Sequence, residues 1–136
     1  MRPIVCIEDN GGMMFFGKRL SKDRILRERV LTLTAGKTLW MSGYSAKQFE
    51  ENGTWIVDDN YMVKAAAADY VFVEDGDFSL EDCDELVLYR WNRRYPADKF
   101  FVADLSDFTL SSVTEFAGSS HETITEEIYR KKGNAR

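Results

Sequence analysis

The sequence predicts a single α/β domain whose mixed, mostly parallel sheet is flanked by helices and completed by antiparallel strands near the C-terminus. In the first two thirds of the chain, short apolar runs alternate with stretches of helical periodicity, as is typical of parallel strands joined by helices. In the last third, β-rich runs follow one another with only turns between them. The 136 residues are 44% hydrophobic, which fits one domain over residues 1–132.

The first segments predict a buried strand and then a helix. Residues 3–7 are an apolar run that ends at the turn-forming residues 8–12. A helix is expected after Ser21, whose hydroxyl can cap it, and Gly36 follows where a left-handed residue would end it. The apolar residues at helical spacing are Ile25, Leu26, Val30 and Leu33.

The middle of the chain continues the alternation. A second helix is expected over residues 45–51, where Asn52 and Gly53 would end it. Residues 65–68, a run of alanines, are expected to form a helical turn or a small-residue packing segment. The expected strands are residues 37–42, 54–57 and 70–73.

The last third is mostly strand and turn. Residues 121–132 fit two structures, because Ile124 and Ile128 lie four apart as in a helix, yet also share one side of a strand. Residues 133–136 are expected to be a frayed tail. The expected strands are residues 85–91, 100–102 and 110–116.

Composition argues against several classes of protein. The net charge of −5 opposes general attraction to phosphate backbones. No stretch approaches the roughly 20 apolar residues of a membrane span, and residues 1–10 lack the apolar length of a signal peptide. Cys6 and Cys83 are expected to be reduced, structural thiols. We therefore expect a cytoplasmic protein without membrane contact.

The sequence gives little support for a metal centre or for a catalytic nucleophile. His121 is the single histidine, which argues against centres built on several histidines, so no metal is expected. Pairing of His121 with Cys6 or Cys83 stays open, because such partners need be near only in space. The acidic residues lack the spacing of a calcium-binding loop, so a solvated loop is expected there. They are Asp75, Asp77, Glu81 and Asp82.

Two further segments have competing interpretations. Residues 89–95 interleave aromatic and basic side chains, which suits stacking on single-stranded nucleic acid. On a strand, however, the aromatic side chains Tyr89, Trp91 and Tyr95 share one face that would point into the core, and we favour this interpretation. Residues 13–16 form an apolar segment after a Gly pair, which is expected to line a pocket or cover a dimer contact.

The order of segments resembles the dihydrofolate reductase fold family. Leu20-Ser21-Lys22-Asp23 is similar to the family's Leu-Pro-x-Asp, and a helix and residues 36–45 follow, where the family has Met-Gly-Arg-x-Thr. The matching segments are residues 4–13, 20–23, 36–45, 84–91, 96–101 and 120–125. The resemblance implies that residues 121–132 form the closing strand.

Departures from the family concern the cofactor most directly. Members hold NADPH partly through a Gly-Gly pair that opens a helix, and the eleven residues between Val73 and Glu85 contain no such pair. The strand and helix that the family has at this point have no counterpart in this sequence. The family's phosphate-binding Arg falls on Gly43, and the acidic residues 75–85 would repel phosphate.

On the substrate side, Asp23 matches the carboxylate that supports protonation of the pterin ring in the family. Its match requires a helix three residues longer than usual, and the family's partner Thr falls on Tyr89. Asp23 also has a purely structural interpretation, since a carboxylate in the first turn of a helix favours the helix dipole. The resemblance implies that the substrate pocket is lined by Ile7, Met13, Met41, Ser45, Phe49 and Tyr89.

The resemblance and the departures from it lead to two possible functions, a binding protein and an enzyme. The favoured one is a non-redox member without cofactor, whose remnant cleft binds a small molecule or a protein. The alternative is an NADPH-dependent reductase of a pterin-like heterocycle with Asp23 as the proton-relay carboxylate, and nucleic-acid binding is a distant third. A homodimer is also possible, because a shortened sheet can expose an edge that a second copy covers.

Overall fold

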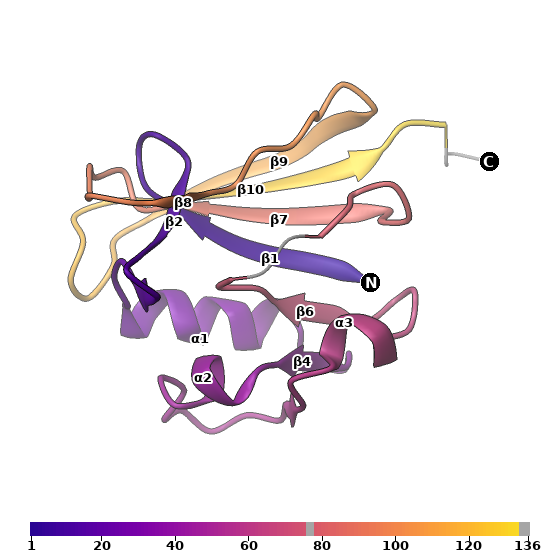
Figure 1. Ribbon diagram of the computed structural model, residues 1–136, viewed down its shortest axis with the longest axis horizontal. Helices are drawn as coiled ribbons and strands as arrows, with labels where there is room; N and C mark the ends of the chain where they lie inside the picture. Colours follow the sequence, from indigo (N-terminus) through magenta and orange to yellow (C-terminus); the bar gives the residue numbers. More distant parts are fainter. Residues whose placement is uncertain (76–77, 134–136) are drawn as a thin grey trace.

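The computed structural model describes residues 1–75 and 78–133 (Figure 1). The strands of its main sheet are β1 (Arg2–Ile7), β4 (Leu39–Met41), β5 (Ile56–Val57), β6 (Tyr70–Phe72), β7 (Glu85–Arg90), β9 (Phe108–Phe116) and β10 (Ile124–Lys131). Their spatial order is β5-β4-β6-β1-β7-β10-β9. Pairing is parallel from β5 to β7, whereas β10 pairs antiparallel with both β7 and β9. The predicted mixed, mostly parallel sheet is confirmed.

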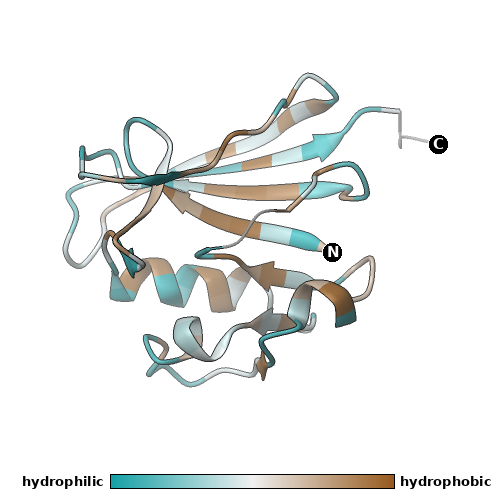
Figure 2. Cartoon of the chain, viewed as in Figure 1, coloured by the Kyte–Doolittle hydropathy of each residue, from teal (hydrophilic) through white to brown (hydrophobic). Residues whose placement is uncertain are grey.

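Strand β1 is the central strand of this sheet, and both of its faces are covered. Ile4 and Val5 point to opposite faces, and both are fully buried. Ile4 belongs to the apolar cluster under helix α1 (Arg24–Leu33), together with Leu26 and Val30. Val5 belongs to the cluster on the other face. Hydropathy follows this arrangement, since the hydrophobic stretches of β1 and β7 lie in the middle of the molecule (Figure 2).

A second, three-stranded sheet was not predicted. It contains β2 (Gly12–Phe15), β3 (Lys18–Arg19) and β8 (Lys99–Phe100) in the order β3-β2-β8. The apolar segment after the Gly pair therefore forms most of a strand: Met13 and Met14 are buried, while Phe16 is exposed at the turn that leads to β3. This sheet holds Arg19 over the carboxyl ends of the main strands.

Helix α1 begins later than its predicted cap. The N-cap is Asp23 and not Ser21, because the Asp23 carboxylate accepts hydrogen bonds from the N–H groups of Ile25 and Leu26. At the other end, Gly36 has φ of +77°, the left-handed conformation expected of a residue that follows a helix.

The other helices are single turns, α2 (Gly43–Ala46) and α3 (Tyr61–Lys64). The predicted helix over residues 45–51 is wrong in extent. After Ala46 the chain makes only tighter bonds, from Gln48 N–H to the Ser45 carbonyl and from Phe49 N–H to the Ala46 carbonyl. Phe49 then enters the core, which turns the chain away from the helical path. Residues 65–68 form a connection with a turn and not a helix.

The ambiguous residues 121–132 form strand β10, as the resemblance implied. Between β6 and β7 the described residues, 73–75 and 78–84, contain no strand or helix. Asp77, one of the acidic residues considered as a metal ligand, and residues 134–136 of the expected tail lie outside the described residues.

Candidate functional site

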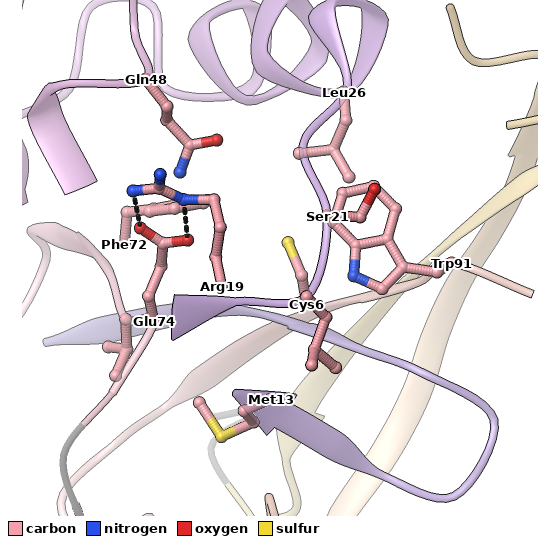
Figure 3. Close-up of a pocket in the computed structure, with 11 residues that line it drawn as sticks. Cys6, Met13, Arg19, Ser21, Leu26, Gln48, Phe72, Glu74 and Trp91 are labelled. Atoms are coloured by element: carbon pink, nitrogen blue, oxygen red, sulfur yellow. Dashed lines mark hydrogen bonds and ion pairs between the residues drawn. The ribbon is translucent and has the colours of Figure 1, made fainter. Parts of the chain in front are cut away.

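A small cavity lies at the carboxyl ends of the central parallel strands, where ligands of open α/β sheets usually bind. Cys6 of β1 and Phe72 of β6 form its floor, and Trp91 follows β7. Its volume is about 10 Å³, close to the space that a single water molecule needs. The cleft is therefore closed by the protein's own side chains. The polar residues that line it are Arg19, Ser21, Gln48 and Glu74 (Figure 3).

An ion pair between Arg19 and Glu74 fills one side of this cleft. Arg19 donates from Nε and Nη2 to the two carboxylate oxygens of Glu74 over 2.9 and 3.0 Å, as the dashed lines in Figure 3 mark. The side chains are 20% and 11% exposed. Two parallel bonds between a guanidinium and a carboxylate are the strong, geometrically specific form of this interaction.

Residues of α2 complete the surroundings of the pair. The guanidinium of Arg19 lies 4.2 Å from the ring centroid of Tyr44 and also donates to the Tyr44 carbonyl. The Ser45 hydroxyl donates to Glu74 over 2.8 Å. Burial works to lower the pKa of Arg19, but its hydrogen bonds to Glu74 outweigh burial and the pKa is raised. The pair thus links β3, α2 and the end of β6.

Gln48 is the unusual polar group of the cavity. The residue is 7% exposed, and its amide nitrogen Nε2 has no hydrogen-bond partner in the part of the chain that the structure describes. An unpaired buried amide costs about 1–3 kcal/mol, so this group is available to a ligand. Cys6 also faces the cavity, where burial raises the pKa of its thiol and keeps it protonated.

Asp23, the predicted proton-relay residue, lies beneath the cavity and does not line it. Besides capping α1, its carboxylate accepts hydrogen bonds from the backbone N–H groups of Ser119 and Ser120 over 3.0 and 2.8 Å. Burial alone would raise the pKa of Asp23, but these backbone bonds outweigh it and hold the pKa well below its usual range. Asp23 is therefore a fixed carboxylate anion inside the fold.

The same carboxylate is joined to the cavity through His121. Asp23 Oδ2 lies 3.1 Å from His121 Nδ1, and His121 Nε2 lies 3.2 Å from the hydroxyl of Ser21, which lines the cavity. Tyr95 also places its hydroxyl 2.9 Å from Nε2, and Trp91 stacks on the imidazole with ring centroids 4.5 Å apart. Sequence reasoning missed this row, because Asp23 and His121 are 98 positions apart.

The residues predicted to line the substrate pocket separate into two groups. Met13 lines the cavity, and Ser45 reaches its edge through Glu74. Four others lie in the apolar core away from the cavity lining: Ile7, Met41, Phe49 and Tyr89. Within the core, Tyr89 donates its hydroxyl to Glu126 over 2.8 Å, and burial raises its pKa well above the usual value.

The surroundings of α2, where the resemblance would place cofactor phosphate, are acidic. The N–H group of Gly43 donates to the carboxylate of Asp59 over 2.9 Å. Asp59 and Asp75 line a hollow of about 420 Å³ beside this helix. A carboxylate of the chain thus takes the backbone donor at Gly43, and a second carboxylate lies beside it.

The structure also bears on nucleic-acid binding, metal binding, membrane crossing and the state of the cysteines. Tyr89 and Trp91 are buried, so within residues 89–95 these rings are not exposed for base stacking. The described residues hold no group of three or more His, Cys, Asp or Glu side chains placed to bind a metal ion. Within the same residues no helix has the length and apolar character that crossing a bilayer requires. Both cysteines are free thiols.

Comparison with known proteins supports the fold. No family model matches the sequence, and no curated protein matches it. Among solved structures 237 chains match. One is dihydrofolate reductase from Enterococcus faecalis, complexed with NADP(H) and RAB-propyl, with a TM-score of 0.67 and 13% sequence identity. The match covers 96% of this chain and 95% of that chain. The protein therefore has a dihydrofolate reductase-like fold.

Proposed function

We propose that this chain is a binding protein of dihydrofolate reductase-like fold that works without NADPH and takes a small molecule in its closed cleft. The observation that carries the proposal is the ion pair between Arg19 and Glu74, which occupies the cleft. A cleft that is closed by two charged side chains can open when a ligand replaces one of them.

The contacts of Arg19 indicate the chemistry of that ligand. Its guanidinium presents two N–H donors to Glu74 and one flat face to Tyr44. A small molecule with an amidinium or guanidinium group has the same planar donor pair and the same positive charge. It can therefore replace Arg19, while the unpartnered amide of Gln48 supplies a donor to an acceptor on the same molecule.

The acidic surroundings of α2 support the absence of NADPH from this function. Phosphate binding near the start of a helix depends on free N–H groups and on a lack of negative charge. Here Asp59 already accepts from Gly43, and Asp75 lies in the same hollow. A phosphate would have to displace one carboxylate and approach another.

Benzamidine is a suitable first probe of the cleft. We expect it to bind Arg19→Ala more tightly than the wild type and to raise the Tm of that variant, since ligands that bind only the folded state stabilise it. Adding Glu74→Gln to Arg19→Ala should abolish the effect. Lys18→Ala is the matched control, because Lys18 is the exposed neighbour on the same strand. An equal benzamidine response in Lys18→Ala and Arg19→Ala would contradict the proposal.

The second candidate is an NADPH-dependent reductase of a pterin-like heterocycle, which the NADP(H) complex of the Enterococcus faecalis enzyme favours. Fluorescence titration with NADPH, with NADH as the control, separates the two functions. Absence of saturable binding up to millimolar NADPH supports the non-redox function. Saturable micromolar binding would overturn it, and Asp23→Asn with dihydropteridine substrates would then be the next step.

A further inference from the structure

The row of Ser21, His121 and Asp23 has a geometry that the binding function leaves unused. The serine hydroxyl and the carboxylate lie on opposite ring nitrogens of one imidazole, at 3.2 and 3.1 Å. Both distances fit hydrogen bonds. A hydroxyl, an imidazole and a buried carboxylate in this order form the arrangement that activates a serine for acyl transfer, whatever the fold that carries it.

The carboxylate fixes which imidazole nitrogen carries the proton. Asp23 is an anion held by backbone N–H groups, so it accepts the proton of His121 Nδ1. In the neutral ring, Nε2 then has a free lone pair that faces the hydroxyls of Ser21 and Tyr95. His121 is thus oriented as a base toward the cavity.

The hydroxyl of Ser21 becomes reachable when Arg19 leaves the cleft, so this centre rests on the opening that the proposed function requires. Ser21 is half-buried and lines the cavity, whereas His121 and Asp23 are buried beneath it. Gln48 lines the same cavity on its Arg19 side (Figure 3), and its amide nitrogen has no hydrogen-bond partner among the described residues. Most of the other lining side chains, among them Met13 and Leu26, are apolar, which suits a small apolar acyl group.

We propose that Ser21 and His121 are the catalytic residues, and Asp23 the positioning residue, of a hydrolase centre that cleaves small carboxylic esters. The Ser21 oxygen forms a bond to the ester carbonyl carbon while its proton passes to His121 Nε2. The carbon–oxygen bond to the alcohol breaks, and His121 returns that proton to the leaving alkoxide. Water, deprotonated by His121, then releases the acid and restores Ser21, so the net reaction is ester and water to acid and alcohol.

Covalent labelling tests the nucleophile directly. A fluorophosphonate probe forms an oxygen–phosphorus bond with an activated serine and releases fluoride. We expect mass spectrometry to place the probe on Ser21 of the wild type. Ser21→Ala should lose the label and lower p-nitrophenyl acetate hydrolysis by about 100-fold or more, the range expected for loss of an activated nucleophile and its base. Ser112→Ala, which removes an exposed serine of β9, is the control and should change neither.

Two further variants probe the base. His121→Gln should also lose the label. Tyr95→Phe should increase it, because Tyr95 competes with Ser21 for the lone pair of Nε2. An unlabelled Ser21 in folded wild-type protein, or a label that survives Ser21→Ala, would overturn the proposal. Benzamidine binding is tested with variants of Arg19 and Glu74, and labelling with variants of Ser21 and His121, so failure of this centre and failure of the binding function are distinguishable.

The single histidine allows a test that does not depend on activity. In ¹⁵N NMR spectra, we expect the imidazole of wild-type protein to carry its proton on Nδ1. Asn at position 23 can present an amide N–H to Nδ1, so Asp23→Asn should shift the tautomer toward protonated Nε2 and lower fluorophosphonate labelling. A merely structural contact with Asp23 would leave labelling of Ser21 unchanged in a folded variant, and that result would contradict the positioning role.

Discussion

At the residue scale, Asp23 shows how one carboxylate can connect separate parts of a fold. It accepts from two N–H groups of α1 and from two N–H groups of the segment that precedes β10. It also orients His121. Buried carboxylates are stable only where such donors surround them, and here the backbone supplies most of them.

The lowered pKa of Asp23 predicts an acid-dependent loss of stability. Because the folded-state pKa lies below that of the unfolded chain, the carboxylate stabilises the fold at higher pH. This stabilisation decreases as the pH falls below about 4, the pKa of an unperturbed Asp. In Asp23→Asn, we expect a loss of about 1–3 kcal/mol at neutral pH and a flatter dependence below pH 4. Urea unfolding across a pH series measures both.

Asp107→Asn is the control for this series. Asp107 is exposed, so its substitution should leave the acid limb of the stability curve in place. If Asp23→Asn retained the same acid limb as Asp107→Asn, the hydrogen-bonded anion at position 23 would not be its source.

At the scale of elements, an ion pair connects helix α1 to strand β10. Arg29 donates from Nε and Nη2 to the two carboxylate oxygens of Glu126, which also accepts from Tyr89. Glu126 is 2% exposed. Burial alone would raise its pKa, but the bonds from Arg29 and Tyr89 outweigh burial, and the pKa is lowered.

Removing the helix side of this pair should destabilise the fold. Arg29→Met leaves a buried carboxylate with one donor, and we expect a loss of about 2 kcal/mol, below the roughly 3–5 kcal/mol of a fully buried pair because Arg29 is partly exposed. Arg24→Met on the same helix breaks the exposed pair with Glu28 and should cost only about 0.3 kcal/mol. Equal chemical-denaturation midpoints for the two variants would contradict this account.

The elements also show which features the sequence alone could predict. Strands β1, β6 and β7 were predictable because they are buried, so their apolar runs are continuous. The sheet that contains β2 and β8 was not, since these strands pair across distant parts of the chain and are at most four residues long. Local propensity cannot specify such contacts.

The residues of the candidate site come from separate parts of the chain, so the sequence alone could name only a few of them. Met13 and Ser45 were named from the resemblance, and both reach the cleft. Glu74 was not singled out from the sequence, because nothing local distinguishes it from the acidic residues that follow it. Its partner Arg19 lies 55 positions away, and only the fold brings the two charges together.

At the scale of the whole molecule, the main sheet of the described residues ends at two strands, β5 and β9. Strand β9 is nine residues long, and on it Leu110 and Val113 are 46% and 52% exposed. Long edge strands with apolar side chains are the usual place for pairing with a second chain. The homodimer that the sequence left open is therefore best tested at β9.

We expect light scattering during gel filtration to show a concentration-dependent dimer of the wild type. Val113→Lys should shift it to monomer, because a charge on an edge strand opposes pairing. Val63→Lys, at an exposed position on α3, is the control and should leave the dimer unchanged. A wild type that stays monomeric at all concentrations would exclude this edge as a dimer contact.

The bonds of Asp23 also have a consequence for how the chain emerges during synthesis. Two of the N–H groups that satisfy its carboxylate belong to Ser119 and Ser120, 96 and 97 positions later. While the ribosome is still making the middle of the protein, helix α1 can pack but its capping carboxylate is only partly satisfied. The first helix therefore reaches its final stability only after residues 119 and 120 have been translated.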